Sequence, residues 1–352
     1  MILSRISASR VAASGMRSSA SARHISATPS CDDSANSCSS PALDSGYDEV
    51  RLATAPIGGD DRPGEREYVA SAVRLGPPAP VPTPPFWGSR VVKGIRLRDV
   101  FPFVNEVTLF RGQWQYQKGV RSEGEYAELL DGEVRPVFRR WQDRAIAERL
   151  LAPQVVYGYF PCLAEENDLL VWPDFDGTKP IGEPVRFRLP RQRDGRRLCI
   201  ADFFRAAPEN GEAPTYDVVA MSLVTVGSRA TEFAKELFAA NDYKEYLHFH
   251  GFAVETVEAL AEMWHKRIRT ELAIAENDSP IMRELFSQHY QGSRYAFGYP
   301  ACPDLEEQVG MVTLLQPERI GVELGETFQW HPEQTTSALV AHHPDARYFV
   351  IR

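Results

Sequence analysis

The feature that most constrains the fold is a proline-rich boundary at residues 76–88, GPPAPVPTPPFWG, which holds six prolines in 13 positions. Prolines at this density keep the backbone extended and remove amide donors, so the segment acts as a stiff tether outside any helix or central strand. Its end, Phe86-Trp87-Gly88, carries two large rings that we expect to dock on a folded body. The boundary therefore predicts one folded domain over residues 86–352.

The sequence before this boundary predicts no folded core. Residues 1–40 contain 13 serines, four arginines and no acid before Asp32, so they cannot bury enough apolar surface to fold. We predict a disordered Ser/Arg-rich tail over 1–45, followed by a Pro-rich linker over 46–85. Without a targeting signal, we expect a cytoplasmic protein. The Arg/Ser-rich, acid-poor start (1–30) also fits a mitochondrial transit peptide, in which case the protein would be mitochondrial. A further alternative is that this start is upstream sequence that is not native coding.

The folded part mixes helical and strand patterns. Residues 133–151 place apolar side chains at a helical period, and further helices are predicted over 228–240 and 242–272 and after Pro303. Short runs rich in β-branched and aromatic residues are separated by turn signals such as DFDGTKPIGEP, which favours antiparallel pairing over parallel winding. The predicted strands are 154–160, 168–172, 185–189, 217–226 and a closing strand at 346–352. The fold class expected is α+β: a single body with a twisted antiparallel sheet flanked by helices.

Composition and missing motifs exclude several function classes. The formal charge of −9 and the lack of a basic block argue against nucleic acid as a partner. No apolar run approaches the roughly 20 residues that span a bilayer, so no membrane partner is expected. The glycine-rich signatures of dinucleotide-binding folds, P-loops and α/β-hydrolases do not occur. The five cysteines are widely spaced and odd in number, which predicts reduced thiols rather than a zinc site or a disulfide framework.

The histidines do not assemble a predicted metal site. Glu262 and His265 have the Glu-x-x-His spacing of di-iron carboxylate bundles, but no second copy accompanies them, so a solvated helix face is the preferred interpretation. His248 and His250 are two apart on a predicted helix and cannot chelate together. No directly bound metal is expected.

Residues 294–304, RYAFGYPACPD, form the candidate ligand loop. Arg294 can hold a carboxylate through two parallel charge-assisted hydrogen bonds, and Gly298 allows backbone to approach a flat ligand. The alternative is an ordinary turn entering a helix at Pro303, whose first turn would accept Asp304. Glu258 lies at the margin of the apolar stripe of the 242–272 helix, where it is either solvated at the edge or placed to meet a cation in a groove.

The stretch 290–308, YQGSRYAFGYPACPDLEEQ, resembles a signature of the C-terminal activation domain of cobalamin-dependent methionine synthase. The family pattern is close to Y-x-G-x-R-P-A-P-G-Y-P-A-C-P-[DE], and this chain differs from it at Tyr295 and Phe297. Other blocks agree in order, among them PFWGSRVV, LFRGQWQ, ENDLLVW, VTVGSRATEFAKELFAANDYKEYLHFHG and HHPDARYFVIR. The resemblance covers about residues 84–352, and none of it matches the family's cobalamin-binding domain.

The resemblance implies a reactivation role in methionine biosynthesis. In that family the domain binds S-adenosylmethionine and presents its methyl group to cob(II)alamin, while a flavodoxin-like partner donates an electron. Methyltransferase activity is therefore expected only with a cobalamin-binding partner domain, and cobalamin would be held there. The residues implied in S-adenosylmethionine binding are Asn105, Glu258, Arg294, Ala296, Gly298, Tyr299, Tyr348 and Phe349, with Tyr299 also the catalytic candidate beside the sulfonium.

One departure from the family concerns the N-terminal ligand position. The family usually carries Asp there, whereas PFVNEVTLF places Asn105, which has no charge to pair with an ammonium. Asn105 is alternatively the cap of a helix leading to LFRGQWQ. The departure keeps a second hypothesis open: a non-catalytic S-adenosylmethionine-binding regulatory module, or an inactive fragment.

Overall fold

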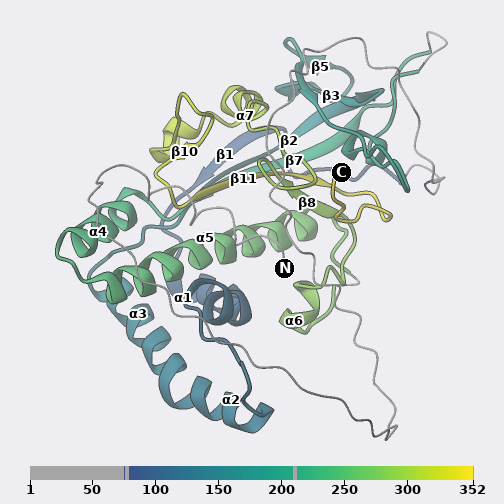
Figure 1. Ribbon diagram of the computed structural model, residues 1–352. Coiled ribbons are helices and arrows are strands. Elements are labelled where there is room, and N and C mark those ends of the chain that lie inside the picture. Colours follow the sequence, from purple (N-terminus) through teal and green to yellow (C-terminus); the bar gives the residue numbers. More distant parts are fainter. Residues whose placement is uncertain (1–74, 76–78, 209–211, 277, 352) are drawn as a thin grey trace, which may run out of the picture. The chain divides into compact units, whose positions relative to one another are not determined.

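The computed structural model describes residues 75, 79–208, 212–276 and 278–351 (Figure 1). The predicted tail, 1–45, and most of the predicted linker lie outside these residues. At the start of the described chain Phe86 docks edge-on against Tyr157 and Tyr159, with ring centroids 5.5 and 5.1 Å apart. The expectation that the end of the tether packs on the folded body is thus confirmed.

The sheet is antiparallel throughout, as the turn signals predict. Its strand order is β6-β3-β2-β7-β11-β8, and β1 pairs with β2 beside this path. Its strands are β1 (Gly88–Val92), β2 (Gln154–Glu165), β3 (Asp168–Val171), β6 (Val185–Arg188), β7 (Asp217–Thr225), β8 (Ser293–Ala296) and β11 (Thr335–Ala341). Two short ribbons flank it, β4 (Asp174–Phe175) with β5 (Pro180–Ile181), and β9 (Glu323–Leu324) with β10 (Trp330–His331).

The central strands are buried on both faces, which explains their nearly continuous apolar sequence. Every residue of β7 is buried. Because side chains alternate along a strand, Val218, Ala220 and Val224 enter one hydrophobic core, and Val219, Met221 and Leu223 enter the other. We call the first the helix-side core, because α5 covers it, and the second the far-side core.

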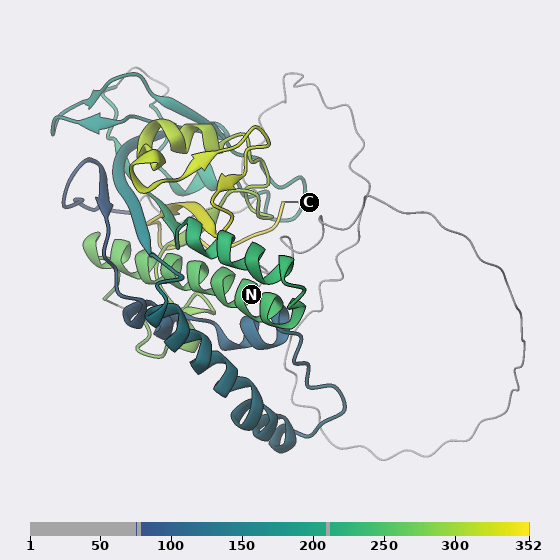
Figure 2. The same cartoon turned by 90° about the vertical axis from the view of Figure 1, so that its left-hand side faces the viewer.

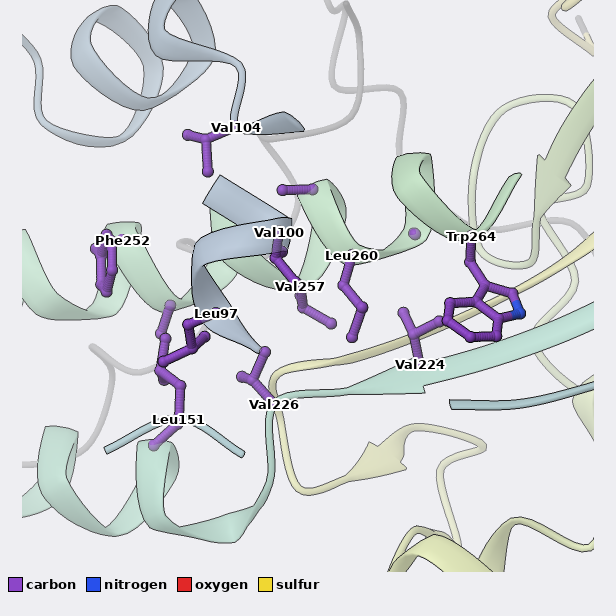
Figure 3. Packing of buried hydrophobic residues seen from close by; sticks show 14 of the residues in the cluster. Leu97, Val100, Val104, Leu151, Val224, Val226, Phe252, Val257, Leu260 and Trp264 are labelled. Atoms are coloured by element: carbon purple, nitrogen blue, oxygen red, sulfur yellow. The ribbon is translucent and has the colours of Figure 1, made fainter. Parts of the chain in front are cut away.

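The helix-side core is built on α5 (Tyr243–Glu271), which lies along one face of the sheet (Figure 1). In Figure 3 Val257, Leu260 and Trp264 of α5 extend toward Val224 and Val226 of the β7 end. In Figure 2 the green helices α4 and α5 lie side by side, and the dark teal helix α3 runs obliquely below them. The other elements on this side are α1 (Leu97–Val100), η1 (Phe101–Phe103), the π-helix η2 (Thr108–Gln113), α2 (Glu123–Leu129), η3 (Leu130–Val134), α3 (Arg135–Ala147) and α4 (Ser228–Ala239).

Short elements cover the far-side core and the C-terminal end of α5. They are η4 (Ile200–Phe203), α6 (Met282–Leu285), α7 (Gln308–Leu315) and η5 (Pro317–Ile320). The helix expected after Pro303 therefore begins only at Gln308. Asp304 explains the delay, because its carboxylate accepts the backbone N–H of Glu306 at 2.9 Å and favours a turn first.

The predicted closing strand at 346–352 is wrong. Residues 346–351 form no strand; instead, the Ile351 N–H donates to the carbonyl of Pro300 at 2.9 Å. Pro300 has no N–H to return, so a ladder cannot build between these segments. The aromatic composition of the segment reflects its burial, since Phe349 packs against Tyr295 and Phe203 in the far-side core.

Two kinds of feature are absent from the residues that the structure describes. None of their helices has the length and apolar character needed to cross a bilayer. Within the same residues, no group of three or more histidine, cysteine, aspartate or glutamate side chains is arranged to hold a metal ion.

Candidate functional site

The site lies where the C-terminal half of α5 faces β8. Glu255, Glu258 and Glu262 are spaced by three and four residues, so their side chains follow one face of the helix. The residues between them, including Val257 and Leu260, anchor the helix in the helix-side core. The packing of α5 thus holds three carboxylates in a row at the margin of the sheet.

Arg294 meets this row from β8. Its neighbour Tyr295 enters the far-side core, so strand alternation turns Arg294 toward α5. The Arg294 side chain is only 8% exposed, and its Nη2 donates to Glu262 Oε1 at 2.8 Å and to Glu258 Oε2 at 3.5 Å. A buried guanidinium therefore contacts two carboxylates that remain 20% and 24% exposed.

Burial and charge set the protonation of this group. Burial alone would lower the pKa of Arg294, but the charges of Glu262 and Glu258 outweigh it and raise that pKa. The pKa of Glu258 is raised, because burial and the charge of Glu262 together outweigh the stabilising guanidinium and the Tyr299 hydroxyl. A cation that approached Glu258 would therefore stabilise a carboxylate that the protein itself leaves incompletely compensated.

A tight turn carries Tyr299 to the same place. The Gly298 N–H donates to the Cys302 carbonyl and the Cys302 N–H to the Tyr299 carbonyl, both at 2.8 Å. Gly298 has φ +82°, and a Cβ on it would lie 2.7 Å from a methyl carbon of Leu305, so the turn requires glycine. The Tyr299 hydroxyl donates to Glu258 Oε1 at 3.4 Å, and the charge of Glu258, together with burial, raises the pKa of that phenol.

Glu255 extends the row at its N-terminal end. Its side chain is buried, and burial raises its pKa to about 8, with a smaller contribution from the charge of Glu258. The Gln113 amide of η2 donates to Glu255 Oε1 at 3.4 Å. At neutral pH Glu255 is therefore largely protonated and neutral, while the N-terminal helical segment reaches the edge of the site through Gln113.

Asn105 has a local role. Its Oδ1 accepts the backbone N–H groups of Val107 at 3.1 Å and Thr108 at 3.3 Å, which caps the helical segment that includes η2. Both of these hydrogen bonds lie within its own segment of the chain. Capping, one of the two alternatives for this position, is thus present, and the ligand contact stays a prediction.

The C-terminal segment lies beside the turn through Tyr295. The Tyr348 ring stacks on Tyr295 with centroids 6.4 Å apart, and the Tyr348 N–H donates to Gln288 Oε1 at 3.2 Å. Phe349 is buried in the far-side core, so a ligand would meet its backbone rather than its ring. Ala296 is also buried and pairs with Ala338 of β11.

The structure brings Glu258, Arg294 and Tyr299 into direct contact, and it adds two residues that sequence reasoning did not place there. Glu262 is the closer carboxylate to Arg294, and Glu255 is buried next to Gln113. The interpretation of Glu262 and His265 as a solvated helix face is wrong, because Glu262 pairs with the buried Arg294 and His265 is itself buried. The signal was present in the sequence, since Glu255 and Glu262 lie three residues before and four after Glu258, on the same helical face.

Comparison with known proteins identifies relatives of this chain. The chain is 48% identical to the methionine synthase of Mycobacterium tuberculosis over 293 residues, which cover 81% of this chain and 24% of that protein. The methionine synthase of Mycobacterium leprae is 47% identical over 279 residues, 76% of this chain and 23% of that one. The chain thus spans about a quarter of the length of these curated relatives.

A solved structure matches as well. The crystal structure of the MetH reactivation domain bound to AdoHcy superposes with a TM-score of 0.65 at 26% identity, covering 77% of this chain and 83% of that one. Residues 116–352 also match the family described as "Vitamin B12 dependent methionine synthase, activation domain". This chain therefore belongs to the activation-domain family of vitamin B12-dependent methionine synthase.

Proposed function

We propose that this chain binds S-adenosylmethionine between α5 and the turn after β8, and presents its methyl group to cobalamin held by a partner domain. The observation that carries the proposal is the buried Arg294 guanidinium, which faces a row of carboxylates and is followed by a glycine-dependent turn. A guanidinium can fork the ligand's carboxylate, and Glu258 can accept its ammonium or its sugar hydroxyls. A structural relative bound to AdoHcy supports the same ligand class.

Each residue of the site then has a positioning task. Arg294 fixes the amino-acid end of the ligand, the backbone at Ala296 and Gly298 lines its flat base, and Tyr299 lies near the sulfonium. Tyr348 and Phe349 close the other side through their backbone. The domain's contribution is orientation and electrostatics, because cobalt on the partner domain and the sulfonium of the ligand carry the bond-making chemistry.

The reaction proposed is reductive methylation. One electron from a flavodoxin-like partner reduces the inactive cob(II)alamin, the S–CH₃ bond breaks, and the methyl group passes to cobalt while its bonding electron pair stays on sulfur as S-adenosylhomocysteine. The Tyr299 phenol stays protonated throughout, because the pKa of Tyr299 is raised. No proton has to leave the site.

The test combines this chain with a cobalamin-domain protein, a reductant and methyl-labelled S-adenosylmethionine. Transfer of label to cobalamin is the expected result, and Tyr299→Phe should bind the ligand but transfer more slowly. A second candidate, a binding module without turnover, is favoured by Asn105, whose side-chain oxygen is already used in capping. Ligand binding without any label transfer would leave only that second candidate.

A further inference from the structure

The carboxylate row holds more negative charge than its guanidinium neutralises. Arg294 contacts both Glu258 and Glu262, and the closer partner is Glu262 at 2.8 Å. With Glu258 and Glu262 both ionised, one cation and two carboxylates carry a formal charge of −1, and these carboxylates are only 20% and 24% exposed. Charge in such a location acts strongly on any ligand charge that enters, because water screens it poorly.

The hydrogen bonds indicate how Glu262 could act without blocking the ligand. Both bonds from Arg294 to the carboxylates are donated by Nη2. A guanidinium presents five N–H donors, so Nε and Nη1 can still donate hydrogen bonds to an incoming carboxylate beside Nη2. Glu262 would then hold the guanidinium in place through Nη2, while the ligand accepts an N–H group of Nε or of Nη1.

The two ligands of the proposed reaction differ in charge. Their amino-acid ends are zwitterions with no net charge, but S-adenosylmethionine carries a positive sulfonium, which becomes a neutral thioether once the methyl group has left. An excess negative charge therefore distinguishes substrate from product without any contact to the methyl group. The raised pKa of Glu258 acts in the same direction, since a nearby ligand cation stabilises its carboxylate.

We propose that Glu262 makes this site selective for ligand charge, so that it holds the sulfonium substrate more tightly than the thioether product and releases the product after transfer. The inference rests on the proposed function and assigns Glu262 as a positioning and selectivity residue. It predicts that a change in the carboxylate row can remove the preference for substrate over product while the site still binds both ligands.

The experiment measures dissociation constants by calorimetry for three ligands. These are S-adenosylmethionine, S-adenosylhomocysteine and sinefungin, an unreactive analogue with a charged amine in place of the methylated sulfur. The wild type should bind both cationic ligands roughly tenfold more tightly than the thioether. Glu262→Gln keeps a hydrogen-bond acceptor for Arg294 and removes the charge, so the preference should fall by about three- to tenfold for both cationic ligands.

Glu245→Gln is the matched control. Glu245 lies on the same helix, bonds Arg140 at 2.7 Å and is 21% exposed, against 24% for Glu262. It is 17 residues from Glu262, about 25 Å along the helix, and its substitution should leave the preference unchanged. Glu262→Asp keeps the charge, so it should retain the preference even where overall affinity falls or stability is reduced.

The outcomes separate the two proposals. A wild type that binds none of the three ligands overturns the proposed function and this inference with it. If the wild type binds the ligands but does not prefer the cationic ones, the inference alone is overturned. The same holds if Glu262→Gln and Glu245→Gln show the same preference for the cationic ligands. A preference lost in Glu262→Gln and kept in Glu262→Asp supports it.

Discussion

Arg294 stabilises the site, because its buried guanidinium compensates Glu258 and Glu262, and we propose that it also recognises the ligand. We expect Arg294→Ala to weaken S-adenosylmethionine binding about tenfold to hundredfold, the effect of losing a charged hydrogen-bond pair of roughly 1.5–3 kcal/mol. The structure indicates a loss of about 3 kcal/mol in the free energy of unfolding, since two partly buried carboxylates lose their cation.

The measurement pairs calorimetry with urea denaturation below the melting temperature. Arg294→Lys is the control, because it keeps the charge but lacks the planar fork; it should recover more of the stability than of the affinity. Unchanged affinity in a folded Arg294→Ala variant would remove this residue from the ligand site.

Glu255 makes stability depend on pH in a defined direction. Burial raises the pKa of Glu255 from 4.5 to about 8, so the folded state keeps a proton that the unfolded state has released. Stability from this group is therefore greatest below about pH 4.5, falls as the pH rises toward 8, and levels off above it. The full change is several kcal/mol at most, since one pKa unit corresponds to about 1.4 kcal/mol.

Glu255→Gln should remove that dependence. The test compares the free energy of unfolding of the variant and the wild type from pH 5 to pH 9, and the variant should gain relative stability as the pH rises. Glu128→Gln, a substitution of an exposed glutamate on α2, should follow the wild type at every pH. Parallel curves for Glu255→Gln and the wild type would show that Glu255 ionises normally in the folded state.

At the scale of elements, Asn105 acts on the helical segment that η2 continues. Its side chain accepts two backbone N–H groups, so Asn105→Ala should cost about 1 kcal/mol of stability, and Asn105→Asp should cost little because aspartate caps as well. If the position also faces the ligand's ammonium, Asn105→Asp should tighten binding by no more than about 1 kcal/mol, and only at low salt.

Denaturation of the three proteins, with S-adenosylmethionine titrations at low and high salt, measures both effects. Equal stability of the wild type and Asn105→Ala would show that the cap contributes nothing. If the wild type and Asn105→Asp have identical affinities at both salt concentrations, asparagine in place of the family's aspartate is neutral for binding.

For the whole molecule, both hydrophobic cores draw their side chains, among the described residues, from Leu75 to Ile351, and we predict that this part folds without the residues before 68. A chain that begins at residue 68 should therefore keep the thermal stability and the ligand affinity of the full chain. Differential scanning calorimetry and ligand titration check this, with a chain that begins at residue 94 as the control. That control lacks β1, which pairs with β2 over five residues, and should be destabilised.

Local sequence patterns determined much of this protein. The period of residues 242–272 predicts α5 within one residue at each end, because an amphipathic helix records its buried face directly in the chain. Turn signals between β-rich runs predicted the antiparallel sheet, and the order of blocks that resemble the family's predicted the family that the comparison confirms. The sequence and its family resemblance also predicted three residues of the site, Arg294, Glu258 and Tyr299.

Tertiary structure decided the features that depend on chain segments meeting in space. From the sequence, Glu262 is interpreted as a solvated helix residue. In the folded chain β8 places Arg294, which is 32 residues further along the sequence, 2.8 Å from it. The aromatic run at 346–352 predicts a strand, but its neighbour carries Pro300, which cannot return a hydrogen bond. Spacing along a chain determines which side chains share one face of a helix or strand, because this depends on local geometry. Which helix face packs against which strand, and which charged side chains then come into contact, is determined only when distant segments pack together.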